Sequence, residues 1–141
     1  RELQRSHRWD DWNLRVVNTR HTVQNLGLRL EAGSPTKVFC YSGDGMFTPT
    51  ASKLYTNADL LVHEAYTNDG TVKNPRGETV TIGTKTHCSL QQLERLDDMA
   101  RPKKMALIHL NRKLREDKKD ILKKYRQRRW IMPDAGEVIE L

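Results

Sequence analysis

The sequence has few of the features that mark secreted or membrane proteins. Only two of its 141 residues are cysteine, too few for a disulfide framework, so we expect a reducing, cytoplasmic location. No run approaches the roughly 18–20 consecutive apolar residues of a membrane span, and we expect no membrane partner. The N-terminus lacks both the apolar stretch of a secretory signal and an initiator Met. We therefore expect the chain to begin inside a longer protein.

Charge is unevenly distributed along the chain. There are 25 Lys and Arg against 18 Asp and Glu, a formal net charge of +7. The segment 101–129 holds 13 of the basic residues and only 3 acidic ones, so the rest of the chain is slightly acidic. A concentrated basic segment can attract polyanions, but an ordinary solvated helix face has the same composition. Charge alone leaves both interpretations open.

The hydrophobic pattern predicts an α/β domain over residues 15–141, preceded by a polar segment, 1–14, without clear periodicity. Residues 67–86 are rich in Thr, Gly, Asn and charge and predict a long loop, which is often functional. The predicted strands are 23–30, 38–41, 58–65, 105–108 and 137–141, and the predicted helices are 49–57, 89–100 and 113–129.

The second predicted helix has the clearest boundary signals. Ser89 and Gln92 fit a capping box at its start, and Arg101 with the following proline ends it. Its apolar stripe runs from Leu90 to Met99 and the adjoining alanine. This stripe predicts one buried face against the sheet.

Several predicted strands end next to a side chain that can bind metal. Asp44 and His109 each follow a short apolar strand, while His21 precedes a strand and His87 precedes a helix. Imidazole nitrogens suit Zn, Fe or Mn, and a carboxylate can bridge two such ions. Ligands at strand ends are held by a rigid sheet, which is typical of a hydrolytic site.

The strand 58–65 ends in two candidate residues, His63 and Glu64. Adjacent side chains on a strand point to opposite faces, so only one of the two can face the site, and we favour Glu64. Simpler interpretations exist for the other candidates: Asp44 lies between two glycines and could be a turn carboxylate. Cys88 stands beside a histidine, but no other feature supports a thiol nucleophile.

The order of these motifs indicates a family. Together they resemble the second half of a metallo-β-lactamase-fold hydrolase, closest to the branch that contains RNase Z and related phosphodiesterases. The resemblance covers about residues 15–141. It rests on His21 followed by 24–30 (QNLGLRL), and on 38–44 (VFCYSGD), 58–65 (ADLLVHEA), 86–89 (THCS) and 104–109 (KMALIH).

The resemblance implies a four-layer αββα sandwich of which this chain supplies the C-terminal half. It implies two zinc ions, with Mn or Fe as alternatives. His21 and His109 would be ligands to different metals, and Asp44 would bridge both. Glu64 would orient His87, and this pair would protonate the leaving alkoxide.

Part of the family pattern is missing. No two histidines lie two residues apart, so the His-x-His-x-Asp-His motif of the first half is absent. We therefore expect this chain to need the missing N-terminal half for activity, and the sheet to expose an apolar face unless another segment covers it. Gly45 stands where RNase Z commonly has Thr, and Leu110-Asn111-Arg112 replaces the usual Phe-Ser-x-Arg-Tyr ending.

The sequence thus predicts a metal-dependent hydrolase, a phosphodiesterase or ribonuclease-like enzyme that acts on an anionic substrate such as RNA. A homodimer is compatible with this interpretation. One alternative is another hydrolase of the same fold, acting on a thioester, sulfate ester or lactam. A second is a non-catalytic basic module that binds nucleic acid or a protein, with the His and Asp residues vestigial. Fold analogy cannot choose among these substrates.

Overall fold

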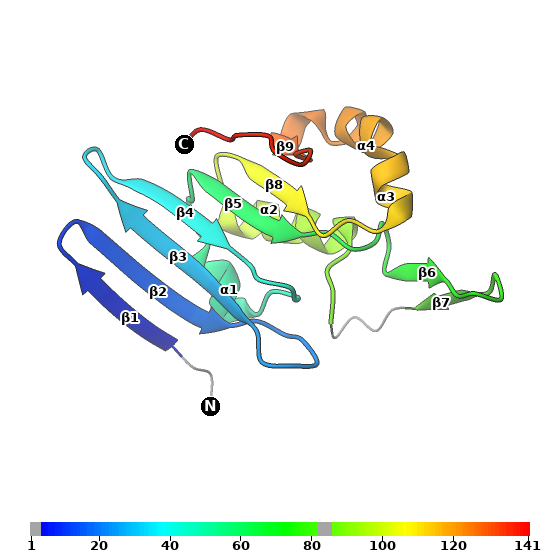
Figure 1. Ribbon diagram of the computed structural model, residues 1–141, viewed down its shortest axis with the longest axis horizontal. Coiled ribbons are helices and arrows are strands. Elements are labelled where there is room, and N and C mark those ends of the chain that lie inside the picture. Colours follow the sequence, from blue (N-terminus) through cyan, green and yellow to red (C-terminus); the bar gives the residue numbers. More distant parts are fainter. Residues whose placement is uncertain (1–3, 82–85) are drawn as a thin grey trace.

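A computed structural model describes residues 4–81 and 86–141. Within these residues the main feature is a mixed sheet of seven strands in the order β1-β2-β3-β4-β5-β8-β9 (Figure 1). The first four strands pair antiparallel, and β4, β5, β8 and β9 pair parallel. The strands are β1 (Gln4–Trp9), β2 (Trp12–Asn18), β3 (Leu26–Ala32), β4 (Lys37–Tyr41), β5 (Leu60–Glu64), β8 (Met105–Ile108) and β9 (Trp130–Ile131).

The helices pack on one side of this sheet, and a small hairpin projects from its end (Figure 1). No helix in the described part of the chain is long and apolar enough to span a membrane. The hairpin consists of β6 (Thr71–Lys73) and β7 (Thr79–Thr81). The helices are α1 (Pro49–Leu54), α2 (Leu90–Ala100), α3 (Arg112–Glu116), α4 (Lys118–Lys124) and the 3₁₀ turn η1 (Arg126–Arg128).

The core lies between the helices and the sheet. Cys40, Leu61 and Met105 come from three adjacent parallel strands and are fully buried against Leu93 and Leu96 of α2. Helix α2 begins at Ser89 with the predicted capping box and ends at Arg101 in a left-handed conformation. Its predicted stripe is correct except at Met99, which is 54% exposed because it lies on the solvent side of the helix.

The opposite face of the sheet is also apolar. The strand registers place Leu28 opposite Tyr41, Leu30 opposite Phe39, and Tyr41 beside Val62. These side chains are only half-buried, and none of the helices drawn in Figure 1 covers this face. The fold therefore presents an apolar surface on this side, as expected from the sequence.

Two predictions in the C-terminal part are wrong. Residues 137–141 form no strand, and Val138 is 85% exposed. The last strand is β9 instead, because Trp130 is buried and stacks on Tyr125, with ring centroids 4.5 Å apart. The single basic helix predicted over 113–129 is divided into α3, α4 and η1, since Asp117 and Tyr125 both leave helical geometry.

Two hairpins were not predicted. Residues that show no clear periodicity form β1 and β2, joined at Asp10 and Asp11 with Trp9 opposite Trp12. Asp10 adopts a positive φ of 37°, which aspartate tolerates better than most residues and which a two-residue turn requires. The predicted loop 67–86 contains β6 and β7, and its residues 82–85 lie outside the described part.

A close approach between β3 and α1 allows a stability test. A Cβ atom at Gly27 would overlap the hydroxyl of Tyr55, whose ring is completely buried. We expect Gly27→Ala to lower the free energy of unfolding by about 2 kcal/mol, as overpacking does. Urea denaturation measures the change.

A matched background makes this test specific. The Tyr55 hydroxyl has no hydrogen-bond partner among the described residues, so Tyr55→Phe removes the closest of the crowding atoms without breaking a bond. Gly27→Ala should therefore cost much less in the Tyr55→Phe background, a non-additivity expected for residues in contact. Equal costs in both backgrounds would contradict the packing described.

Candidate metal centre

Three of the candidate residues meet at one edge of the sheet. Strands β4, β5 and β8 are parallel neighbours, so their carboxyl ends lie side by side. Asp44 follows β4, Glu64 is the last residue of β5, and His109 follows β8 with a positive φ of 52°. The regular sheet thus carries side chains that are far apart in sequence into one place.

His87 joins this edge through contacts of the chain that precedes α2. The backbone N–H of Tyr66 donates to the carbonyl of Cys88 at 2.9 Å. Glu64, whose side chain is fully buried, accepts the backbone N–H of Cys88 at 2.7 Å and contacts Nδ1 of His87 at 2.8 Å. One carboxylate therefore fixes both the backbone beside His87 and the imidazole itself.

Asp44, Glu64, His87 and His109 form a cluster of potential metal ligands. One nitrogen or oxygen atom from each lies within 4.8 Å of the other three. Oδ1 of Asp44 is 2.6 Å from Nδ1 of His109 and 3.3 Å from Nδ1 of His87. This oxygen is buried, yet no described residue donates a hydrogen bond to it. A buried carboxylate oxygen without a hydrogen bond, set among imidazole nitrogens and a second carboxylate, suits a bound cation.

The electrostatics of the cluster point the same way. Burial raises the pKa of Glu64 to about 8, and the nearby charge of Asp44 adds to the increase, although the hydrogen bond from Cys88 opposes it. A cation beside the two carboxylates would remove this penalty on the charged form. Carboxylate oxygens and imidazole nitrogens are ligands that Zn²⁺, Mn²⁺ and Fe²⁺ accept. The four residues thus fit a transition-metal site.

The loop that carries Asp44 is held by Asn25, a residue without a role in the sequence-based prediction. Oδ1 of Asn25 accepts the backbone N–H of Asp44 at 3.3 Å, and its Nδ2 donates to Oγ1 of Thr19 at 2.5 Å. A Cβ atom at Gly45 would lie 2.8 Å from the carbonyl oxygen of Arg20, a backbone atom that cannot move aside easily. This close approach explains why the chain has Gly45 at the position where RNase Z commonly has the larger Thr.

His21 lies beside the cluster without being one of its four members. The bridge between Arg20 and Met46 places it next to the loop that carries Asp44. Its ring is 5.3 Å from that of His87 in an edge-to-face arrangement. The structure therefore brings His21 near the other predicted residues but leaves it in the outer part of the site.

Two neighbouring residues are excluded from the cluster by their surroundings. His63 points to the helix side of the sheet, between the rings of Phe47 and Tyr55, and its complete burial lowers its pKa to about 4. Its direction opposite to Glu64 is the one predicted from strand alternation. Burial raises the pKa of Cys88 to about 12, which keeps the thiol protonated and agrees with the rejection of a thiol nucleophile.

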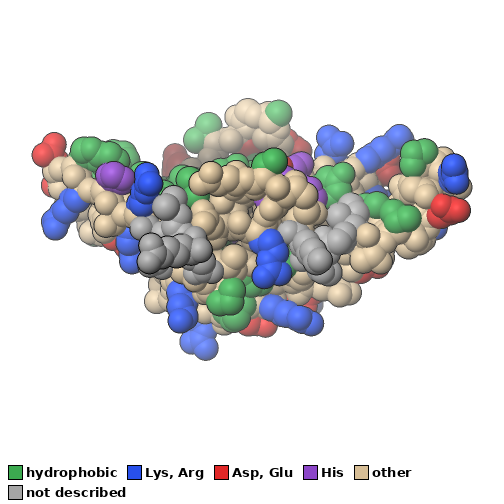
Figure 2. All heavy atoms as spheres, turned by 90° about the horizontal axis from the view of Figure 1, so that it is seen from below, with side chains coloured by type: hydrophobic (Ala, Val, Ile, Leu, Met, Phe, Trp, Pro, Cys, Tyr) green, Lys and Arg blue, Asp and Glu red, His purple; other side chains and the backbone are tan. Residues whose placement is uncertain are grey.

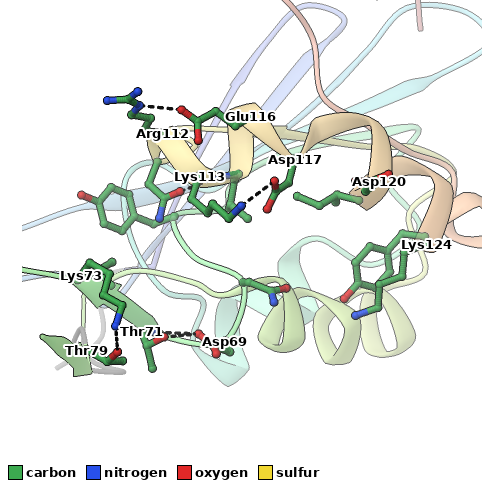
Figure 3. Close-up of a pocket in the computed structure, with 17 residues that line it drawn as sticks. Asp69, Thr71, Lys73, Thr79, Arg112, Lys113, Glu116, Asp117, Asp120 and Lys124 are labelled. Atoms are coloured by element: carbon green, nitrogen blue, oxygen red, sulfur yellow. Dashed lines mark hydrogen bonds and ion pairs between the residues drawn. The ribbon is translucent and has the colours of Figure 1, made fainter. Parts of the chain in front are cut away.

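Tyr66 was missed by the sequence analysis, although it directly follows the quoted segment 58–65. Its ring stacks on that of His87, with centroids 4.6 Å apart, and makes an edge-to-face contact with the ring of His109, with centroids 5.5 Å apart. Tyr66 also lines a cleft of about 910 Å³ between the β6–β7 hairpin and helices α3 and α4 (Figure 3). The cleft therefore reaches the candidate metal centre at this residue.

Comparison with known proteins identifies the fold. No protein-family model and no curated protein matches the sequence. Among solved structures, human tRNase Z, short form, matches 77% of this chain at a TM-score of 0.61 and 19% identity. YhfI from Bacillus subtilis, a metallo-β-lactamase-fold protein, matches 75% of this chain at a TM-score of 0.58 and 18% identity. A diphosphatase of the PhnP family matches 75% of this chain at a TM-score of 0.50 and 14% identity.

These similarities show that the chain has the metallo-β-lactamase fold, as the sequence motifs predicted. Only part of each solved structure is matched: the chain covers 40% of the human tRNase Z, 39% of YhfI and 35% of the diphosphatase. The chain thus spans about two-fifths of the structures that it resembles.

Proposed function

We propose that this chain forms part of a metal-dependent phosphodiesterase, with further metal ligands supplied by the rest of the protein. The observation that carries the proposal is the convergence of Asp44, Glu64, His87 and His109 around a buried oxygen without a hydrogen-bond donor. Two of the similar solved structures are named as a tRNase and a diphosphatase, which supports chemistry at phosphorus.

Asp44 and His109 would hold the metal ions, with His21 as an additional ligand and Asp44 between the two ions. We propose zinc, with manganese or iron as alternatives. When bound, the ions supply an activated water and neutralise charge on the phosphoryl oxygens. Asn25 keeps the backbone of Asp44 in place, so the carboxylate needs little rearrangement on metal binding.

Glu64 and His87 would provide the proton for the departing alkoxide. The carboxylate accepts at Nδ1 of His87, which fixes the orientation of the ring. The other ring nitrogen, Nε2, is then the proton donor toward the substrate. Tyr66 packs on the same ring and limits its rotation.

A purely nucleic-acid-binding role receives less support from the basic segment. Arg128 is paired with Asp97 and Asp98 of α2, and Lys113 is paired with Asp117. On the face shown in Figure 2 the Lys and Arg side chains are spread over the surface without a continuous patch. These charges are therefore better described as solvated and partly paired than as a dedicated phosphate-binding surface.

Metal analysis and hydrolysis assays on the full-length protein test the proposal. We expect about two transition-metal ions per chain and hydrolysis of bis-p-nitrophenyl phosphate that stops on chelation and returns with Zn²⁺. Thioester, sulfate ester and lactam substrates serve as a comparison panel. Metal-free protein that hydrolyses the phosphodiester at the same rate, or faster turnover of another substrate class, would contradict the proposal.

A further inference from the structure

Tyr66 occupies a position between the candidate metal centre and the cleft. Its ring packs against His87 with the planes only 26° apart, and it makes an edge-to-face contact with the ring of His109. The residue is half-buried and lines the cleft between the β6–β7 hairpin and helices α3 and α4. A group that enters the cleft beside the metal centre therefore meets an aromatic surface.

The charges in the cleft are balanced. Figure 3 shows basic and acidic side chains on both walls. Arg112 pairs with Glu116, and Lys113 pairs with Asp117, each across one helical turn. Both ion pairs are exposed to solvent, so each contributes little stabilisation. Four basic and four acidic residues line the cleft: Lys73, Arg112, Lys113, Lys124, Asp69, Glu116, Asp117 and Asp120. Because these charges cancel, the cleft does not favour a polyanion over an uncharged group.

The remaining lining residues suit an uncharged planar group with polar edges. Asn68 carries an amide that can both donate and accept hydrogen bonds. Oδ1 of Asn111 caps α3 by accepting the N–H of Leu114, so its NH₂ group remains as a donor, and the Thr71 hydroxyl, which donates to Asp69, remains as an acceptor. Aromatic side chains such as Tyr66 and Tyr125 stack on flat heterocycles. A nucleobase combines a flat face with donors and acceptors along its edge, and it can be attached directly to a phosphodiester.

We propose that Tyr66 is a specificity residue, on which an aromatic base of the substrate stacks while the adjoining phosphodiester lies at the candidate metal centre. This inference rests on the proposed function, since it assigns the part of the substrate next to the reacting bond. The position of Tyr66 against His87 also makes it a positioning residue for that imidazole. Stacking on the ring thus couples recognition of the base to the alignment of His87.

Binding of two matched ligands tests the role of Tyr66 without turnover. Adenosine 5′-monophosphate and ribose 5-phosphate differ only in the base, and their dissociation constants can be measured by calorimetry on the zinc-loaded full-length protein. We expect the ligand with the base to bind about tenfold more tightly to the wild type. Tyr66→Leu should remove most of this preference, and Tyr66→Phe should keep it because the ring remains.

A direct contact measurement covers the case in which Tyr66→Leu does not fold. In the wild-type protein, NMR should detect proximity between the ring protons of Tyr66 and the base protons of adenosine 5′-monophosphate. Lys123→Ala, an exposed change outside the cleft lining, is the matched control and should keep the preference. Equal affinity for the two ligands in the wild type, no binding of either, or a preference that survives Tyr66→Leu overturns the inference.

The same experiment separates this inference from the proposed function. If the base preference is present and depends on Tyr66 but no phosphodiester is hydrolysed, the proposed function fails and the inference about Tyr66 stands. If phosphodiesters are hydrolysed with equal kcat/KM whether or not they carry a base, the inference fails alone. A fall in kcat for the baseless substrate in Tyr66→Leu would report the positioning of His87.

Discussion

Asp44→Ala is expected to release metal from the full-length protein and to lower phosphodiester hydrolysis by more than about a hundredfold. Loss of a residue that only supports a ligand typically costs up to about a hundredfold, so loss of the proposed bridging ligand should cost more. Asp44 is also the residue whose buried oxygen approaches two imidazoles without a hydrogen bond. Elemental analysis and initial rates with bis-p-nitrophenyl phosphate measure both effects.

The stability of the metal-free protein distinguishes this result from simple misfolding. The charge of Asp44 disfavours ionisation of the buried Glu64, so its removal relieves repulsion within the cluster. We therefore expect the free energy of unfolding of metal-free Asp44→Ala to be no lower than that of the metal-free wild type. Asp134→Ala removes an exposed aspartate paired with Lys118 and is the control that should keep metal and activity. Full activity in Asp44→Ala would refute the proposed role.

The positions of the main candidate residues could be predicted because they follow from strand geometry. Asp44 and His109 come after short apolar segments, and segments of that kind form the central parallel strands whose carboxyl ends meet at one edge. The choice of Glu64 over His63 needed only the alternation of side chains along a strand. Both side chains are fully buried, but on opposite sides of the sheet. The choice of His63 would therefore have assigned to the site a residue that faces away from it.

The parts that escaped prediction depend on contacts between distant segments. Asn25 supports Asp44 across 19 positions of the chain, and nothing in the local sequence marks it as a hydrogen-bond partner. Tyr66 contacts the candidate metal centre only because His87, far along the chain, folds back onto its ring. In the β1–β2 hairpin only β2 alternates, at Trp12, Leu14 and Val16, while β1 is polar up to Trp9 and therefore gives no strand signal.

The second apolar face of the sheet lies on the same side as the candidate metal centre. Leu28, Leu30, Phe39 and Tyr41 lie on the same side of the sheet as Glu64, which ends the neighbouring strand. A segment that covers these half-buried side chains would therefore also approach the candidate metal centre. Burial of apolar area contributes roughly 25 cal/mol per Å², so this face offers a strong driving force for docking. We propose that the rest of the full-length protein occupies it.

Glu64→Gln is expected to lower kcat by about a hundredfold for phosphodiesters that release an alkoxide, the upper range for a residue that supports a functional imidazole. The glutamine carbonyl can still accept the hydrogen bond from the N–H of Cys88, but its NH₂ group cannot accept a hydrogen bond from Nδ1–H of His87. The imidazole then loses the acceptor that fixes its orientation, so proton donation toward the substrate becomes slower. Glu64→Ala would instead leave the buried N–H of Cys88 without an acceptor, a destabilisation of about 1–3 kcal/mol.

The leaving group decides whether the Glu64–His87 pair acts as the proton donor. A p-nitrophenolate departs without help from an acid, whereas an alkoxide needs a proton as the bond to phosphorus breaks. Both Glu64→Gln and His87→Ala should therefore reduce hydrolysis of an alkyl phosphodiester far more than that of bis-p-nitrophenyl phosphate, and the double variant should be little worse than either single one because the two residues act as a unit. Equal losses on the two substrates would mean that the pair serves metal binding, since loss of metal slows both reactions alike. The ratio of the two rates in Glu64→Gln, measured at full metal occupancy, thus assigns the buried carboxylate either to the proton donor or to the metal.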